Sequence, residues 1–237
     1  MPSVRMEELA FADHGAELFG AALSPGQLDA IHSVFAALPA DQPGLRLHGL
    51  SGLRPFLSAD GPVGQIAASV LGRDCRPVRA ILFDKSAGKN WALGWHQDRT
   101  IAVKKRIDVS GFGPWSVKDG MVHVEPPFEL LAGMVTLRVH LDPVPASNAP
   151  LLIAPGSHKV GRIPDRSFAE LVKQYGVVAC LADAGDIWLY ATPILHASKA
   201  ASAPSHRRVL QVDYSVSDLP GGLEWLGFWG VAVSALG

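Results

Sequence analysis

The stretch VRAILFDKSAGKNWALGWHQD, residues 78–98, indicates how the chain folds. Two runs typical of β-strands, 78–85 and 91–98, flank the turn-forming segment SAGKN. Many short strands separated by turn residues predict a sandwich or barrel rather than βαβ units. Four further runs have the same character: GMVTLRVHLD (133–142), PLLIAPG (150–156), GDIWLYAT (185–192) and RRVLQVDYS (207–215).

The part of the chain before these strands has a helical pattern. Ser24 and Pro25 form an N-cap and first-turn pair, and apolar residues then recur at helical spacing as far as Leu38. A second helix is predicted over 63–71, and a third, inside the β-rich part, around 168–175. An apolar stripe on each of the first two requires a surface to pack against.

We therefore expect a single domain over residues 1–237, mainly β with an α component. A helical N-terminal layer over 1–75 should pack on one face of a β core over 76–216, and 217–237 should form a C-terminal extension. The Gly- and Pro-rich segment 99–130 is predicted to be a long loop, and such loops are usually lids or binding loops.

Composition excludes several function classes. The 21 basic and 22 acidic side chains nearly balance, so the chain has no electrostatic signature of nucleic-acid binding. No apolar run is long enough to span a membrane, and the acidic N-terminus does not resemble a secretory signal. Cys75 and Cys180 lack metal-type spacing and are expected to be buried, reduced thiols of a cytoplasmic protein.

His96 and Asp98 are the first candidate metal ligands. On a strand, residues two apart point to the same face, so an imidazole and a carboxylate would lie side by side while Gln97 faces away. His196 follows a later predicted strand and could complete a set of two histidines and one carboxylate. Such a set leaves coordination positions open on iron(II). An ordinary surface strand would explain the His-x-Asp pair equally well.

Arg207 lies on the next predicted strand, eleven positions after His196. A planar guanidinium is a natural bidentate partner for a dicarboxylate. Arg207 and Arg208 are adjacent on a strand, so one should face inward and the other outward. A surface salt bridge would account for either arginine.

Together, these segments resemble the phytanoyl-CoA dioxygenase family of iron(II)- and 2-oxoglutarate-dependent oxygenases. The resemblance spans residues 78–215 and follows the order of the family's motifs. It implies a double-stranded β-helix, the jelly-roll or cupin-like barrel, with the metal inside one end. The matching segments are LFDKSAGKNWALGWHQD, MVTLRVHLDPVPASNAPLLIAPGSHKVGRI, AGDIWLYATPILHAS and RRVLQVDYS.

The same resemblance implies roles for individual residues. His96, Asp98 and His196 would bind Fe(II), and a carboxylate at Asp98, rather than a small residue, favours hydroxylation over halogenation. Arg207, with the nearby Ser198 hydroxyl, would hold the distal carboxylate of 2-oxoglutarate. Four further residues match positions around this co-substrate: Thr136, Arg138, Lys85 and Ile81. The family can carry an aromatic residue where this chain has Arg138.

The implied activity is an Fe(II)/2-oxoglutarate dioxygenase that uses O2 to hydroxylate or otherwise oxidise a small organic metabolite, releasing succinate and CO2. The predicted loop is the expected place for substrate contacts, with four candidates: Arg99, Lys118, Trp115 and His123. Its mixture of basic and aromatic residues suits a molecule with an anionic group. Two alternatives are a cupin-like metalloenzyme that acts without 2-oxoglutarate and a catalytically silent jelly-roll binding protein.

Overall fold

A computed structural model describes residues 4–39, 44–86, 88 and 90–229. None of the helices in these ranges is long and apolar enough to cross a membrane. The α-helices are α1 (Phe11–His14), α2 (Pro25–Phe35), α3 (Arg54–Leu57), α4 (Pro62–Leu71), α5 (Phe128–Ala132) and α6 (Phe168–Tyr175), and the 3₁₀ turns are η1 (Met6–Glu8), η2 (Ser51–Leu53), η3 (Ser157–Val160) and η4 (Asp165–Ser167).

The strands form three sheets, and every strand pair is antiparallel. The six-stranded sheet has the order β1-β11-β8-β13-β3-β2, the four-stranded sheet β10-β9-β12-β4, and the three-stranded sheet β5-β7-β6. The strands are β1 (Ala16–Phe19), β2 (Leu45–Leu47), β3 (Arg76–Lys85), β4 (Leu93–His96), β5 (Ile101–Val103), β6 (Trp115–Lys118), β7 (Met121–Val124), β8 (Val135–His140), β9 (Leu151–Ile153), β10 (Val178–Cys180), β11 (Ile187–Ala191), β12 (His196–Ser198) and β13 (Arg207–Ser215).

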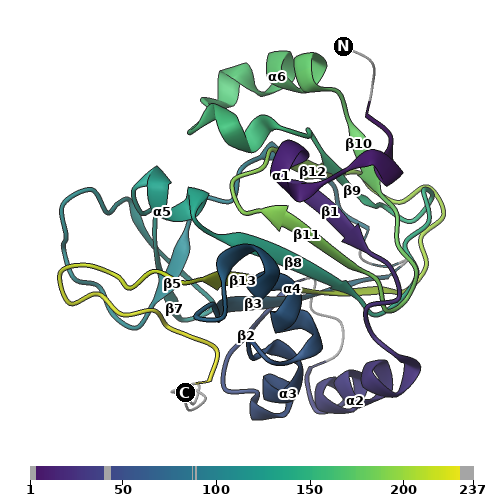
Figure 1. Ribbon diagram of the computed structural model, residues 1–237, viewed down its shortest axis with the longest axis horizontal. Coiled ribbons are helices and arrows are strands. Elements are labelled where there is room, and N and C mark those ends of the chain that lie inside the picture. Colours follow the sequence, from purple (N-terminus) through teal and green to yellow (C-terminus); the bar gives the residue numbers. More distant parts are fainter. Residues whose placement is uncertain (1–3, 40–43, 87, 89, 230–237) are drawn as a thin grey trace.

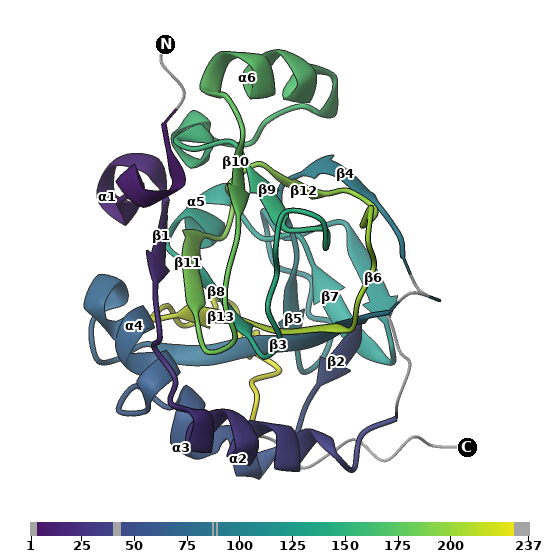
Figure 2. The same ribbon diagram turned by 90° about the vertical axis from the view of Figure 1, so that its right-hand side faces the viewer.

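The two larger sheets face each other, as the jelly-roll prediction requires. Figure 2 shows the four-stranded sheet above the six-stranded one, with α2 and α3 below the latter. Between the sheets lies an apolar cluster that includes Trp188 and Tyr190 of β11 and Ile153 of β9. The predicted mainly β, jelly-roll fold is confirmed.

The N-terminal helices cover the outer face of the six-stranded sheet, also as predicted. Ile31 of α2, Leu57 of α3 and Val63 of α4 are all fully buried in one cluster with outward-facing residues of the sheet such as Leu137 and Leu210. Helix α2 begins where the sequence predicts, because the Ser24 side chain accepts a hydrogen bond from the Gln27 backbone N–H in a capping box. The predicted helices at 63–71 and 168–175 correspond to α4 and α6 (Figure 1).

The segment 99–130 differs from the loop that we predicted. It contains the whole three-stranded sheet and the start of α5, and its fully or almost fully buried residues include Ile101, Val103 and Val124. These residues pack with Val78 of β3 in a separate cluster. Glycines and prolines mark the bends between its short strands, so the composition of a loop and that of a small, tightly turned sheet are alike.

The N- and C-terminal parts contribute more to the β structure than predicted. β1 and β2, both inside the expected helical layer, form the two edges of the six-stranded sheet. From the expected extension 217–237, Trp225 pairs with Val103, and Phe228 is fully buried in the cluster beneath the helices. The rest of that extension, 230–237, lies outside the described residues, as do 1–3 and 40–43 of the helical layer.

Candidate metal centre

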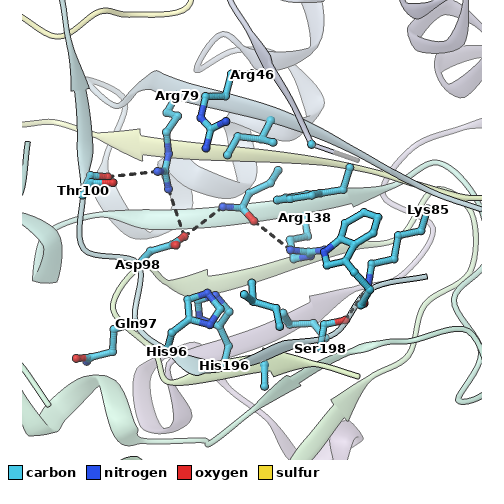
Figure 3. A pocket seen from close by; sticks show the side chains of 18 of the residues that line it. Arg46, Arg79, Lys85, His96, Gln97, Asp98, Thr100, Arg138, His196 and Ser198 are labelled. Atoms are coloured by element: carbon cyan, nitrogen blue, oxygen red, sulfur yellow. Dashed lines mark hydrogen bonds and ion pairs between the residues drawn. The ribbon is translucent and has the colours of Figure 1, made fainter. Parts of the chain in front are cut away.

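A cavity of about 400 Å³ lies between the two larger sheets. Its walls are the inner faces of β3, β8 and β13 on one side and of β4 and β12 on the other. The inner face of the six-stranded sheet is polar because alternate residues of its strands, Arg138 and Gln211 for example, point away from the helices. Figure 3 shows the side chains that converge there.

His96, Asp98 and His196 meet in this cavity. His96 is the last residue of β4 and His196 the first of β12, and the two lie directly opposite each other in the antiparallel pair. Their ring centroids are 4.2 Å apart. One potential ligand atom from each of the three residues lies within 4.8 Å of the others. Asp98 lies two residues beyond the end of β4, so a short extension rather than a regular strand positions it.

The hydrogen bonds of both histidines suit metal binding. Nδ1 of His96 lies 2.8 Å from the Gly94 carbonyl oxygen, and Nδ1 of His196 lies 2.8 Å from that of Ile194. A carbonyl can only accept, so each Nδ1 carries the proton and each Nε2 keeps a free lone pair. Burial lowers the pKa of His196 to about 4, so its ring is neutral at neutral pH. Neutral imidazoles with an oriented second nitrogen are typical metal ligands.

Asp98 is held by two neighbours on the six-stranded sheet. Its Oδ2 accepts hydrogen bonds from Arg79 Nη2 at 3.2 Å and Gln211 Nε2 at 3.3 Å. Burial acts to raise the pKa of Asp98, but the Arg79 guanidinium, the two histidines and the Gln211 hydrogen bond together lower it below its ordinary value. Oδ1 has no hydrogen-bond partner among the described residues. The carboxylate is therefore ionised and offers one oxygen, and with the two imidazoles it matches the donor set of non-haem iron(II).

Arg79 and Gln211 connect Asp98 to a wider polar network. Arg79 Nε also donates to Asp213 Oδ2 at 2.5 Å, and Asp213 accepts a second hydrogen bond from Thr136 Oγ1 at 3.0 Å. Gln211 Oε1 accepts from Arg138 Nη1 at 3.0 Å. The network fixes Asp98 from behind and links it to the cationic end of the cavity.

Gln97 turns away from the two histidines, as the strand geometry predicts (Figure 3). Its Nε2 donates to the carbonyls of Pro193 at 2.8 Å and Gly161 at 3.1 Å, and its Oε1 accepts from the Ile163 backbone N–H at 2.9 Å. Gln97 thus joins the segment that carries His96 and Asp98 to two others, residues 161–163 and the turn before β12.

Three cationic side chains occupy the other end of the cavity: Arg207, Arg138 and Lys85. Arg207 lies opposite Lys85 in the β13–β3 register, and it donates to the Ala149 carbonyl. Lys85 Nζ donates to the Trp91 carbonyl at 2.8 Å and to Ser198 Oγ at 3.3 Å. No ion pair with a carboxylate is seen for any of the three within the described ranges. This part of the cavity can therefore accept an anion.

Burial affects the protonation of these cations. Burial, followed by Arg207 and Arg138, lowers the pKa of Lys85 to about 8. Burial and Arg138 likewise lower the pKa of Arg207, but a guanidinium starts so high that it keeps its proton at neutral pH. The side-chain Nε atoms of Arg138 and Arg207 are buried without a hydrogen-bond partner. The three positive charges repel one another, and a bound carboxylate would reduce this repulsion.

The structure distinguishes the two adjacent arginines of β13. Arg207 is 3% exposed and lines the cavity. Arg208 points to the opposite face, where Nε and Nη2 each donate to a different oxygen of Asp142 at 2.8 Å. One arginine faces inward and the other forms a bidentate salt bridge, as strand alternation predicts.

Only some of the remaining predicted site residues line the cavity. Ile81 lines the cavity, whereas Thr136 is fully buried behind it. Arg99 and Lys118 line the cavity, but Trp115 and His123 do not. Trp115 packs in the cluster around the three-stranded sheet, and His123 is fully buried with Nδ1 2.9 Å from the Met121 carbonyl.

Sequence reasoning missed Arg79, Gln211 and Arg46. All three line the cavity on strands where other site residues were predicted or on their neighbours. Arg79 lies six residues before Lys85 and Gln211 four residues after Arg207, so period-two alternation places each on the face of its predicted neighbour. That signal was available in the sequence. Arg46 lies on β2, which the sequence did not predict to be a strand.

Comparisons with known proteins agree with this fold. An ectoine dioxygenase from Sphingopyxis alaskensis is 25% identical over 183 residues, which cover 68% of this chain and 53% of that enzyme. The chain thus spans about half the length of this relative. The crystal structure of apo EctD from S. alaskensis has a TM-score of 0.63 at 21% identity, covering 87% of this chain and 74% of that one.

A second solved structure has the same fold. HygX from Streptomyces hygroscopicus, with nickel, 2-oxoglutarate and hygromycin B bound, has a TM-score of 0.60 at 18% identity, covering 86% of this chain and 84% of that one. The family model described as Phytanoyl-CoA dioxygenase (PhyH) matches residues 11–209, which include β3, the His-Asp-His cluster and Arg207. With most of its length matched by this model, the chain belongs to the phytanoyl-CoA dioxygenase family.

Proposed function

We propose that this chain is an iron(II)- and 2-oxoglutarate-dependent dioxygenase that hydroxylates, or otherwise oxidises, a small organic molecule. One observation carries the proposal: a His-Asp-His cluster lines the same cavity as three cations that have no carboxylate partner among the described residues. Membership of the phytanoyl-CoA dioxygenase family supports it. So do solved relatives that contain iron, or 2-oxoglutarate with 5-hydroxyectoine.

In this proposal, Nε2 of His96, Nε2 of His196 and Oδ1 of Asp98 bind iron(II). The backbone carbonyls of Gly94 and Ile194 hold the imidazoles in the required tautomer. Arg79 and Gln211 hold Asp98 ionised and turned toward the histidines. Bound iron(II) and 2-oxoglutarate would supply the oxidising chemistry, with consumption of O2 and release of succinate and CO2.

Arg207 and Ser198 bind the distal carboxylate of 2-oxoglutarate in this proposal, and Lys85 and Arg138 add positive charge around it. Ile81 contributes an apolar wall to the same cavity. Thr136 does not contact the co-substrate in this proposal; it supports Asp213, which in turn holds Arg79. Together these residues orient the dianion and exclude water from it.

We also propose that the described parts of the chain work as one domain. A single apolar cluster joins α2, α3 and α4 to the six-stranded sheet and includes Phe228 from the C-terminal segment. Neither the helical layer nor that segment could leave without exposing this cluster to water.

Anaerobic titration tests the activity. Addition of iron(II) and then 2-oxoglutarate should produce a weak visible charge-transfer band, and oxygen should then release succinate. His96→Ala and Arg207→Gln should abolish the band at ordinary concentrations of both additives, whereas Arg208→Gln, the outward-facing neighbour, should keep it. Absence of the band and of 2-oxoglutarate-dependent succinate formation in the wild-type protein would overturn the proposal.

A further inference from the structure

A second part of the cavity is cationic, in addition to the Arg207 end. Here it is lined by Arg46 of β2 and Lys118 of β6, which we call the β2–β6 subsite. Arg46 lies directly opposite Ile81 in the β2–β3 register. In Figure 3, Arg46 lies beside Arg79, and Lys85 and Ser198 lie on the other side of the pocket. The cavity thus has two groups of cations, one beside Arg79 and one beside Ser198.

Lys118 has no carboxylate partner among the described residues. Its Nζ donates a hydrogen bond to Thr100 Oγ1 at 3.4 Å. Burial, Arg46 and Arg79 lower the pKa of Lys118. Asp98 offsets part of this effect, and an anion bound beside the ammonium and the two guanidinium groups would stabilise its charge further.

Arg46 is also incompletely paired. Nη1 forms an ion pair with Asp119 at 2.5 Å, but the Asp119 side chain is 58% exposed and lies at the rim. The Arg46 Nε atom is buried without a hydrogen-bond partner. An exposed ion pair contributes little, so Arg46 can exchange this contact for a ligand at small cost.

The other two cations near this subsite are already engaged. Arg79 is bound by Asp98 and Asp213. Arg99 donates to the Ile163 carbonyl, forms an ion pair with Asp165 at 3.1 Å and lies over the Phe168 ring. Arg99 shares with Arg46 a buried, unpartnered Nε and an exposed acid, but the Ile163 carbonyl and the Phe168 ring hold it toward the chain around α6. The two carboxylates of 2-oxoglutarate would be used at the iron and at Arg207, so they do not serve the β2–β6 subsite.

We propose that the molecule oxidised by this chain carries an anionic oxyacid group, a carboxylate or a phosphate, which Arg46 and Lys118 bind while the rest of the molecule faces the iron. This inference rests on the proposed function. It names Arg46, which no sequence pattern indicated, and retains Lys118 but not Arg99 as a substrate-binding residue.

Binding of matched small probes to the anaerobic protein loaded with iron(II) and 2-oxoglutarate tests the inference. The probes are benzoate, phenyl phosphate and, as the neutral control, benzamide. Relaxation enhancement of the probe's proton NMR signals by the iron reports binding near the metal without requiring turnover. We expect at least one anion to bind about tenfold more tightly than benzamide, because hydrogen bonds to a charged group are stronger than neutral ones. The anion that binds tighter identifies the oxyacid class.

Four variants locate the effect. Lys118→Met and Arg46→Met should each remove most of the preference for the anion, and Lys105→Met, an exposed lysine between β5 and β6, should leave it unchanged. Asp119→Asn should act in the opposite direction and tighten anion binding, because it releases Arg46. Asparagine tolerates the left-handed backbone at this position (φ 51°), so the turn is kept.

The outcomes separate the two proposals. Loss of the charge-transfer band in the wild-type protein would overturn the dioxygenase function. A normal band with equal binding of anions and benzamide, or a preference that survives both Lys118→Met and Arg46→Met, would overturn the β2–β6 subsite alone.

Discussion

Strand β8 buries six consecutive side chains, but its two faces differ completely. Val135, Leu137 and Val139 pack against the helices, whereas Thr136, Arg138 and His140 face the interior between the sheets. The adjacent strand β13 repeats the contrast, with Leu210 and Val212 outward and Gln211 and Asp213 inward. On the outer face, burial of apolar surface stabilises the fold.

The inner face bears costs that the outer face avoids. Both ring nitrogens of His140 are buried without a hydrogen-bond partner, and so is Nε of Arg138. Burial and the nearby Arg138 and Arg207 lower the pKa of His140 to about 3, so it stays neutral. Unsatisfied buried polar groups are rare in proteins and concentrate where a ligand binds. The inner face is therefore arranged for ligands at the expense of stability.

Removal of a cation from the inner face should have the largest effect on the free energy of unfolding. Arg79→Met leaves Asp98 and Asp213 without their cation, and we expect it to lower the free energy of unfolding by about 3–5 kcal/mol. Urea denaturation measures this. Arg76→Met, on the same strand but paired with the exposed Asp218, should cost less than about 1 kcal/mol. Equal costs for the two variants would contradict the assignment.

A substitution on the outer face should lower stability without changing the binding of 2-oxoglutarate. Leu137 is fully buried among the helices, and Leu137→Ala should lower the free energy of unfolding by about 2–5 kcal/mol because it leaves a cavity. The folded variant should still form the charge-transfer band at the same 2-oxoglutarate concentration. A large shift in that concentration would mean that the two faces of the sheet are coupled.

Replacement of a neutral inner-face residue should change the affinity for iron(II) more than the free energy of unfolding. Gln211 bridges Asp98 and Arg138, so Gln211→Met should weaken iron(II) binding by about 10- to 100-fold, as loss of a group that orients a metal ligand typically does. Anaerobic iron titration measures the change. The exposed Gln65 provides the control, since Gln65→Met on α4 should leave the iron affinity unaltered. Unchanged affinity in Gln211→Met would exclude a role for this bridge.

The sequence predicted the regular parts of both faces well. β13 spans 207–215 as predicted, and α2 begins at its predicted cap. Strand alternation also explains why Arg207 faces inward and Arg208 outward. Periodicity succeeded there because each residue's environment is set by its own strand.

Prediction failed where the environment is set by distant segments. The short strands of the segment 99–130 pair with one another, but their apolar contacts include Val78 of β3 and Trp225 of the C-terminal segment, so local composition resembled a loop. His123 and Trp115 belong to that small sheet and not to the cavity. Arg46 was missed for the same reason, since β2 is a three-residue edge strand whose place depends on pairing with β3.

The smallest expected effect is a pH dependence at the cationic end of the inner face. Lys85 has a pKa of about 8 in the free protein, and a bound dianion would raise it, so the complex holds more protons than the free protein at pH 8. Raising the pH from 7 to 8.5 should therefore weaken 2-oxoglutarate binding by only a few-fold, because the upper pH lies just above the pKa of Lys85 and removes only part of its charge. Burial lowers the pKa of Arg207, which also faces the site, to about 9, but a guanidinium does not lose its proton in proteins, so this residue stays charged over the range. Lys85→Gln should bind more weakly at pH 7 and lose most of the decline. The same decline in Lys85→Gln would assign it to another group.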